Sequence, residues 1–126
     1  MGTNYTNEDT KIIYKELSYK INGILFKVHN ELERFCREKQ YSDAIESLLK
    51  DAKINYIREK ETSLKNIPDF VIDNKIILEI KATPFVLREH FTQTQRYLQD
   101  HKIKLGILVN FRSKYLKPIR IIRIDS

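Results

Sequence analysis

The chain is poor in the residues that build specialised frameworks. Its 126 residues include one cysteine, three glycines, three prolines and no tryptophan. The single Cys36 excludes an internal disulfide and a cysteine-rich zinc site, and the low glycine and proline content excludes a collagenous or low-complexity chain. No apolar run approaches the roughly 20 residues of a membrane-spanning helix, and the N-terminal segment lacks the basic-then-apolar order of a signal peptide. These absences predict one globular domain over residues 1–126, with no membrane segment and a cytoplasmic location.

Positive charge is concentrated near the C-terminal end. The net charge is +6, and residues 102–126 hold seven Lys or Arg against the single acid Asp125, whereas residues 1–101 are balanced. A basic segment often only keeps a protein soluble, but it is also the footprint of a protein that binds a phosphate backbone. The candidates for nucleic-acid contact are Arg112, Lys114, Lys117, Arg120 and Arg123. The alternative is a solvated edge strand that its charges protect from pairing.

Hydrophobic spacing predicts eight elements in the order ααβββαββ. Apolar residues three or four apart predict helices over residues 7–32 and 37–52. Short runs rich in β-branched residues predict strands over 54–64, 67–73 and 75–82. Thr83 and Pro84 resemble an N-cap and a first helical residue, so a helix is expected up to Asp100, followed by strands over 104–111 and 119–124. This order predicts an α/β fold (an α+β mixed sheet) covered by helices.

Two charged residues interrupt the apolar strand predicted around residues 76–81. Glu79 and Lys81 are two positions apart, so their side chains share one face of the strand. Charges in such a run need a reason, because the apolar neighbours indicate burial. Asp69, on the preceding strand, joins them only if the pairing register agrees.

The length of the turn decides that register. The residues Asp73-Asn74-Lys75 tolerate turn dihedrals and predict a hairpin. A three-residue loop sets Ile72 opposite Ile76 and brings Asp69 opposite Glu79. A two-residue loop would send the acids to different faces, because a one-residue slip flips every side chain, unless a bulge restores the register. A shared acid site therefore requires the longer loop.

Two carboxylates on one face favour a bound cation. They would repel each other in a poorly solvated pocket, and a hard ion such as Mg²⁺ relieves that repulsion. Asp69, Glu79 and the backbone carbonyl of Ile80 could hold the ion. Lys81 could orient or help deprotonate a water, or stabilise charge on a phosphate during attack. The alternative is an exposed pair of Glu79 and Lys81 on an edge strand, with Asp69 as a turn acid.

Four segments between about Glu16 and Arg123 resemble the PD-(D/E)XK nuclease superfamily and, within it, the GxxExxR family. They are ELSYKINGILFKVHNEL, REKQYSDAIESLL, IPDFVIDNKIILEIKA and QTQRYLQDHKIKLGILVNF, and the third contains the pattern P-D-(x)9-E-x-K. The resemblance implies a restriction-endonuclease-like core with two N-terminal helices. It also implies a nuclease that uses Mg²⁺, or Mn²⁺, to hydrolyse phosphodiesters, with DNA as the expected partner.

The resemblance also assigns roles to residues. It implies that Asp69 and Glu79 bind the metal and that Lys81 is the catalytic lysine. It adds Glu38 as a helix-borne glutamate and Gln93 as a glutamine of the helix after the third strand. Both stand on apolar helical faces, so they are expected to point inward.

The chain departs from the family pattern on either side of Glu38. The family name asks for Gly and Arg where this chain has Phe35 and Tyr41. The first change would alter how the two N-terminal helices meet, and the second removes a partner for Glu38 or for a substrate phosphate. Two other classes therefore stay open: a catalytically silent nucleic-acid-binding module, and an assembly domain whose tail strand pairs with another copy. A homodimer is compatible with the small size, and no motif selects DNA over RNA or duplex over single strand.

The remaining candidates have structural interpretations. His29 is expected to be structural or to line the substrate site, and His90 and His101 have no spacing that indicates zinc. Gly106, alone within a strand, predicts close packing of the backbone rather than a phosphate loop.

Overall fold

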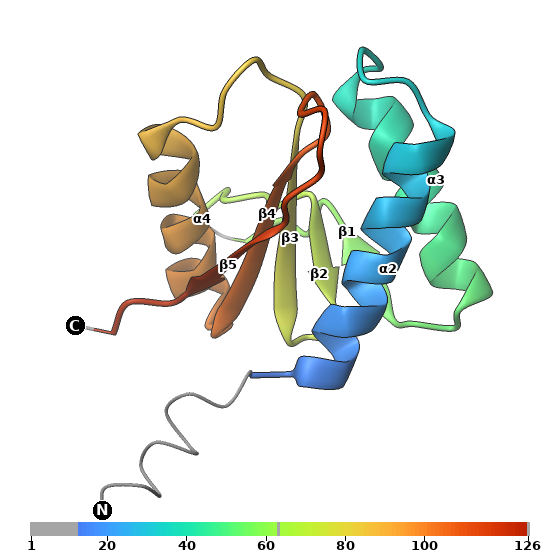
Figure 1. The fold of residues 1–126 in the computed structure, drawn as a ribbon. Helices are drawn as coiled ribbons and strands as arrows, with labels where there is room; N and C mark the ends of the chain where they lie inside the picture. Colours follow the sequence, from blue (N-terminus) through green and yellow to red (C-terminus); the bar gives the residue numbers. More distant parts are fainter. Residues whose placement is uncertain (1–12, 63, 126) are drawn as a thin grey trace, which may run out of the picture.

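The computed structural model describes residues 13–62 and 64–125, in which three helices cover a five-stranded mixed sheet (Figure 1). The helices are α2 (Lys15–Glu31), α3 (Glu38–Asp51) and α4 (Arg88–His101). The strands are β1 (Tyr56–Arg58), β2 (Phe70–Ile72), β3 (Ile76–Lys81), β4 (Leu105–Asn110) and β5 (Ile119–Ile122). The predicted α/β fold and the order ααβββαββ are confirmed. None of these three helices is long and apolar enough to cross a membrane.

The sheet has the order β1-β2-β3-β4-β5, and only β3 and β4 are parallel. A parallel pair needs a crossover connection, which α4 supplies. The crossover returns the chain to the amino end of β4, so the carboxyl ends of β3 and β4 meet at one edge. The loop between α2 and α3 reaches the same edge, at the top of the view in Figure 1.

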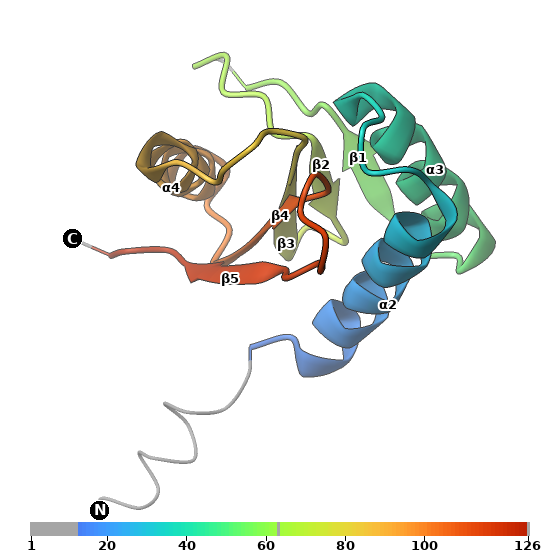
Figure 2. The same ribbon diagram turned by 45° about the horizontal axis from the view of Figure 1, so that its top comes forward.

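The sheet separates two hydrophobic cores, with α2 and α3 on one face and α4 on the other (Figure 2). The residues of β3 that join the core with α2 and α3 are Ile76, Leu78 and Ile80. Ile77 instead joins Leu98 of α4 in the smaller core. Because side chains alternate along a strand, Glu79 and Lys81 share the face of Ile77. The alternation therefore directs both charged side chains toward α4.

Helix α4 lies close to β4 at Gly106. A Cβ at this position would lie 2.9 Å from Thr94 Cγ2 and 3.6 Å from Leu98 Cδ1. The nearer contact is too short for a real Cβ, and the buried Thr94 cannot move easily because its hydroxyl donates to the His90 carbonyl at 2.8 Å. The predicted close backbone packing at Gly106 is confirmed.

Helix α4 begins later than the sequence predicts. The expected start is Thr83, but the first helical residue is Arg88 and the N-cap is Leu87. Thr83 does not open the helix because the Asn110 side chain bonds both its N–H, at 3.1 Å, and its carbonyl, at 2.8 Å. His90 caps the helix instead, since its Nδ1 accepts from the Leu87 N–H at 3.0 Å. A long-range contact therefore overrides the local N-cap pattern.

Further predicted boundaries differ from the structure. The strand predicted over 67–73 begins only at Phe70, so Asp69 directly precedes β2 instead of lying on it. Of the strand predicted over 54–64, the structure forms only Tyr56–Arg58, because Glu59 takes a left-handed φ of 54° and the chain then leaves the sheet; position 63 lies outside the described residues. The His101 Nε2 atom lies 2.9 Å from the Asn66 carbonyl and so ties this connection to α4. The first helix begins at Lys15, and the part of the prediction over residues 7–12 lies outside the described residues.

Candidate active site

The hairpin of β2 and β3 has the three-residue loop that a shared acid site requires. Ile72 pairs with Ile76. Asp73 and Asn74 take left-handed φ values of 51° and 53°, and the Lys75 N–H donates to the Ile72 carbonyl at 2.9 Å. The residue types at the turn therefore produce the register that sets the two acids opposite each other.

Asp69 and Glu79 are joined through backbone amides at the end of this hairpin. The Asp69 N–H donates to Glu79 Oε2 at 2.7 Å, and the Ile80 N–H donates to Asp69 Oδ2 at 2.7 Å. Each carboxylate thus has one oxygen fixed by a hydrogen bond. The Ile80 side chain faces the opposite core, so only the backbone of Ile80 belongs to this site.

Burial sets the protonation of the pair. The side chain of Glu79 is 2% exposed, and desolvation together with the charge of Asp69 raises its pKa. Desolvation also raises the pKa of Asp69, against the opposing effects of the Ile80 N–H and the charge of Lys81. Without a cation, each acid in the folded protein therefore keeps its proton up to a higher pH than an exposed carboxyl group would.

Lys81 and Gln93 meet beside the acids. The Lys81 ammonium donates to Gln93 Oε1 at 3.2 Å. Gln93 therefore points inward, as predicted, and holds the lysine from the first turns of α4. His90 lies on the same helix, and burial followed by the charge of Lys81 lowers its pKa. An unprotonated Nδ1 is what its capping bond to Leu87 requires.

Glu38 reaches the same edge from the start of α3. Its Oε2 accepts from the Ala82 N–H at 3.3 Å, directly after Lys81. A depression of about 480 Å³ is lined by Glu38, Asp69 and Glu59, and the charges of both glutamates raise the pKa of Asp69. Glu59 belongs to no motif that the sequence could reveal, because its N–H reaches the Asp69 carbonyl, at 2.9 Å, only through the tertiary fold.

The departures from the family pattern take structural roles. Tyr41 is fully buried and stacks on Phe111 with ring centroids 4.4 Å apart. Its hydroxyl accepts from the Cys36 N–H at 3.2 Å and donates to the Glu33 carbonyl. Position 41 therefore holds the loop between α2 and α3 rather than facing Glu38. Phe35, in contrast, is 71% exposed.

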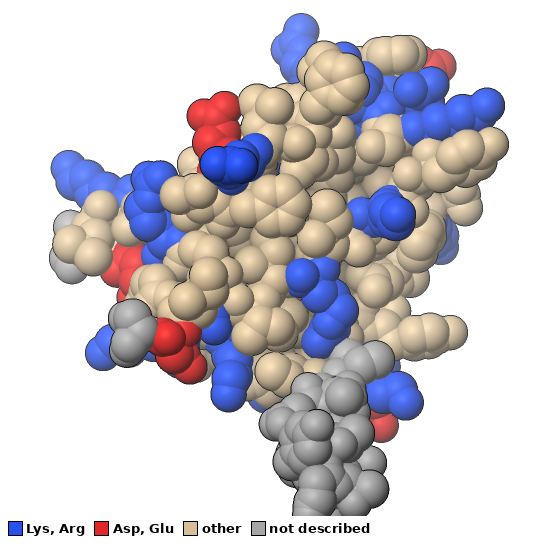
Figure 3. Space-filling model, turned by 60° about the vertical axis from the view of Figure 1, so that its left-hand side comes forward, with Lys and Arg blue, Asp and Glu red and all other residues tan. Residues whose placement is uncertain are grey.

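The basic C-terminal residues are spread over the molecule. Arg112 lies at the site, since its Nη2 donates to the Ala82 carbonyl at 3.1 Å. Arg120 instead donates to the Ile13 carbonyl at 2.9 Å, and Arg123 is paired with Asp125 at the far end of β5. Figure 3 shows Lys and Arg scattered over the side of α4 and β5 rather than in one patch.

The exposed lysines Lys114 and Lys117 lie between β4 and β5, near the site edge. His29 ties this connection to α2, because its Nε2 lies 2.8 Å from the Ser113 carbonyl. The two lysines and the carbonyl that His29 contacts therefore all lie in the loop that follows β4.

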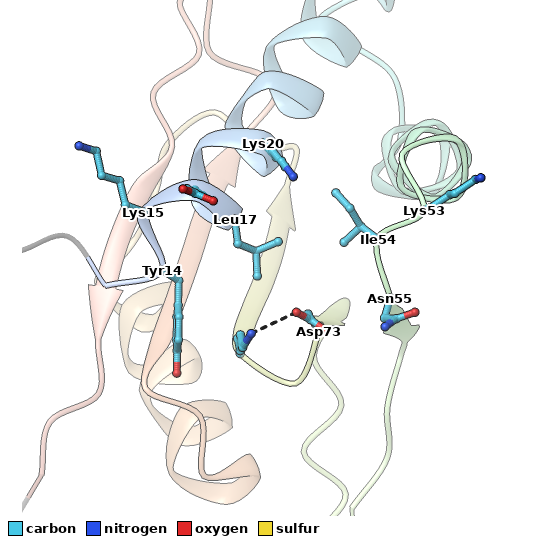
Figure 4. A pocket seen from close by; sticks show the side chains of 10 residues that line it. Tyr14, Lys15, Leu17, Lys20, Lys53, Ile54, Asn55 and Asp73 are labelled. Atoms are coloured by element: carbon cyan, nitrogen blue, oxygen red, sulfur yellow. Dashed lines mark hydrogen bonds and ion pairs between the residues drawn. The ribbon is translucent and has the colours of Figure 1, made fainter.

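A second pocket, of about 530 Å³, lies at the opposite end of the sheet (Figure 4). Lys15 and Lys53 line it but point away from each other, and Lys75 is paired with Asp73 at 3.4 Å. Its charged groups do not converge on one point. The acid pair therefore has no counterpart in this pocket.

The acid pair fits a hard divalent cation. No ion pair joins Asp69 or Glu79 to a lysine or arginine in residues 13–62 and 64–125. No three His, Cys, Asp or Glu side chains of that part of the chain form a metal-binding group, so the protein ligands would be two carboxylates and the Ile80 carbonyl. Mg²⁺ suits such a set because it keeps several waters and takes one or two carboxylates.

The mixed sheet, its crossover helix and the Asp–Glu–Lys edge together define a nuclease-like α/β core. The sequence model of the PD-(D/E)XK nuclease superfamily matches residues 15–124. The chain belongs to the PD-(D/E)XK nuclease superfamily. No significant match was found among curated proteins or among solved structures.

Proposed function

We propose that this protein is a divalent-metal-dependent nuclease that hydrolyses DNA phosphodiesters, with Mg²⁺ as the ion and Mn²⁺ as a substitute. The observation that carries the proposal is the buried Glu79 with the half-buried Asp69 beside it. The two acids share one face of the sheet with Lys81 and form no ion pair among the described residues. Membership of the nuclease superfamily supports the reaction class. The net charge of +6 supports a polyanionic substrate.

The residues of the chain divide the work. Asp69, Glu79 and the Ile80 carbonyl would hold the ion. A bound divalent cation supplies Lewis acidity that offsets phosphate charge and lowers the pKa of water. Lys81 would orient the attacking water or stabilise charge that develops on the phosphate. Gln93 is a positioning residue, because its Oε1 fixes the Lys81 ammonium.

We also propose membership of the GxxExxR group within the superfamily. Glu38 supports it, since its carboxylate bonds the Ala82 N–H and lines the depression next to Asp69. In this chain Glu38 acts without an arginine at position 41, where Tyr41 is buried. Glu38 would support the ion or the water from the side of α3.

The second candidate is a catalytically silent nucleic-acid-binding module with the same fold. One observation favours it: the described residues contain no group of three side chains able to hold a metal. In that case the exposed basic residues after β4 would bind phosphates while Asp69 and Glu79 hold no ion.

The test is titration calorimetry of Mg²⁺ and Mn²⁺ together with cleavage of plasmid and oligonucleotide DNA. Three proteins are compared: wild type, the double variant Asp69→Ala/Glu79→Ala, and the control Asp43→Ala/Glu46→Ala, which removes two acids outside the site. We expect metal binding and cleavage in the wild type and the control, and neither in the Asp69 and Glu79 variant.

Each result decides between the candidates. Metal binding without cleavage of any substrate would contradict turnover and favour the silent module. No metal binding by the wild type would contradict the ion site itself. Thermal melts of all three proteins show whether a loss reflects the site or the fold.

A further inference from the structure

Three loops form a rim around the carboxyl ends of β3 and β4. They are residues 32–37 between α2 and α3, 82–87 between β3 and α4, and 111–118 between β4 and β5; this set is called the rim below (Figures 1 and 2). Direct bonds join the loops, since Arg34 Nε donates to the Arg112 carbonyl at 3.0 Å and Arg112 Nη2 to the Ala82 carbonyl at 3.1 Å. The rim therefore surrounds the end of the strand that carries Lys81.

The rim holds most of the strongly exposed aromatic side chains. The four most exposed in the described residues are Tyr19 (80%), Tyr115 (79%), Phe85 (74%) and Phe35 (71%). Tyr115, Phe85 and Phe35 each come from a different rim loop, and only Tyr19 lies elsewhere. Single exposed aromatics are common on protein surfaces, but three on three loops around one site form a pattern.

Phe35 is held between two arginines. The guanidinium carbon of Arg34 lies 5.4 Å from the ring centroid and that of Arg112 lies 5.3 Å from it. Arg112 also has its Nε buried without a hydrogen-bond partner among the described residues. On a third loop, the Lys114 ammonium lies 5.5 Å from the ring of Tyr115. Exposed rings thus stand directly beside cations.

The charge of the rim is one-sided. Its loops contain five basic residues and one acid, Glu33; the basic residues are Arg34, Arg37, Arg112, Lys114 and Lys117. Cations attract a phosphate backbone regardless of sequence, and aromatic faces stack on bases that are not already paired and stacked. The bases of an intact duplex do not offer those faces.

We propose that the rim binds an unpaired nucleic-acid strand, with bases stacked on Phe35, Phe85 and Tyr115 and phosphates held by the neighbouring cations. This inference rests on the proposed nuclease function and specifies its substrate as single-stranded or locally unpaired. The strand would pass over the end of β3, where the Arg112 bond to the Ala82 carbonyl brings the rim next to Lys81.

The first experiment measures binding separately from cleavage. Fluorescence anisotropy in EDTA compares labelled single-stranded DNA, single-stranded RNA and a DNA duplex of the same sequence, each about 12 nucleotides long to cover one binding site. We expect one or both single strands to bind at least about tenfold more tightly than the duplex. Equal or tighter binding of the duplex would overturn the proposal.

The second experiment tests the rings. Phe35→Ala, Phe85→Ala and Tyr115→Ala are each expected to weaken single-strand binding about fivefold or more, the effect of losing one stacked base. Tyr19→Ala is the matched control, because Tyr19 is equally exposed and lies beside Lys20 but outside the rim. Unchanged binding by all three rim variants, or an equal loss in Tyr19→Ala, would contradict the stacking role.

Cleavage assays on the same three oligonucleotides keep this proposal distinct from the nuclease proposal. Metal-dependent cleavage of the duplex alone would support the nuclease proposal and contradict the proposal that the rim binds an unpaired strand. Ring-dependent binding of single strands without any cleavage would uphold the rim and overturn the nuclease.

Discussion

Two pairs of acids in this protein have pKa values that shift in opposite directions. Asp43 and Glu46, on α3, are bonded to Arg58 at 2.7 and 2.9 Å, with Lys39 also on Asp43 and Tyr56 on Glu46. Hydrogen bonds from Lys39 and Arg58 lower the pKa of Asp43, and those from Tyr56 and Arg58 lower the pKa of Glu46. The pKa values of the second pair, at the end of the hairpin, are raised by burial.

The difference separates a structural cluster from a candidate site. Asp43 and Glu46 each accept a hydrogen bond from a positively charged side chain, and Glu46 also accepts one from a tyrosine hydroxyl. The negative charge of both acids is therefore compensated within the fold. Among the described residues, Asp69 and Glu79 accept hydrogen bonds only from backbone N–H groups and form no ion pair, and only the charge of Lys81 nearby opposes theirs. Buried acids without a counter-charge are therefore more informative about function than the number of acids.

The largest expected effect is on cleavage. Lys81→Ala is expected to lower the rate of oligonucleotide cleavage by at least about 100-fold, because it removes the ammonium group that shares a sheet face with Asp69 and Glu79. The fold should remain, since the backbone bonds of Lys81 are kept and, among the described residues, its side chain makes a single hydrogen bond, to Gln93. Single-turnover rates measure the effect. Lys39→Ala, beside the compensated pair, is the control, and a wild-type rate in Lys81→Ala would remove the role assigned to this residue.

The next effect is a gain in stability. In the unfolded chain Asp69 and Glu79 lose their protons near pH 4, whereas in the folded protein they keep them until the pH reaches their raised pKa values. The folded state therefore becomes less stable as the pH rises from about 4 to those values. Glu79→Gln is neutral at every pH and is expected to stabilise the metal-free protein by about 2 kcal/mol at pH 8, with the gain vanishing near pH 4. Denaturant unfolding at several pH values tests this, and a loss of stability at pH 8 would contradict it.

A smaller gain is expected from the ion itself. Mg²⁺ at about ten times its dissociation constant should stabilise the wild-type protein by about 1.4 kcal/mol, because the ion binds only the folded state. In Asp69→Asn/Glu79→Gln the increase in melting temperature should disappear, while in Asp43→Asn/Glu46→Gln it should persist. Equal stabilisation of all three proteins would indicate binding elsewhere.

The smallest effect concerns the compensated pair. Arg58→Met keeps the aliphatic stem near Phe70 but removes the charge shared by Asp43 and Glu46, and should cost about 1 kcal/mol at pH 7. Because the folded pKa values of these acids are lowered, their stabilisation is present above about pH 4 and is lost as the pH falls below it. Urea unfolding at pH 7 and pH 3 measures the difference. An Arg58→Met deficit that grew at low pH would contradict it.

Local patterns predicted the part of the site that lies on one hairpin. The alternation of β3 was enough to turn Glu79 and Lys81 to one face, and the residues Asp73 and Asn74 were enough to predict a hairpin. The sequence left two loop lengths open, and the structure selects the three-residue loop that sets Asp69 opposite Glu79. These features depend on residues within about a dozen positions of one another, where backbone geometry leaves few choices.

What the sequence did not predict depends on contacts between distant segments. Helix α4 starts later than predicted because the Asn110 side chain bonds Thr83. Glu59 lies beside Asp69 because the chain leaves β1 in a left-handed conformation. The basic residues after β4 were expected to act together, yet an antiparallel strand carries Arg123 away from the end of β4 where Arg112 lies. Spacing along the chain cannot reveal such separations.

The bonds that hold the rim use main-chain acceptors almost throughout. Arg34 donates to a carbonyl of residue 112, His29 lies against the carbonyl of Ser113, and Asn110 bonds the backbone of Thr83. A backbone carbonyl is present whatever side chain its residue carries. Residues that only supply such an acceptor can therefore be substituted without loss of the hydrogen bonds that join the loops. Substitutions during evolution could therefore change which ligands the rim prefers while β3 and its acid pair stay unchanged.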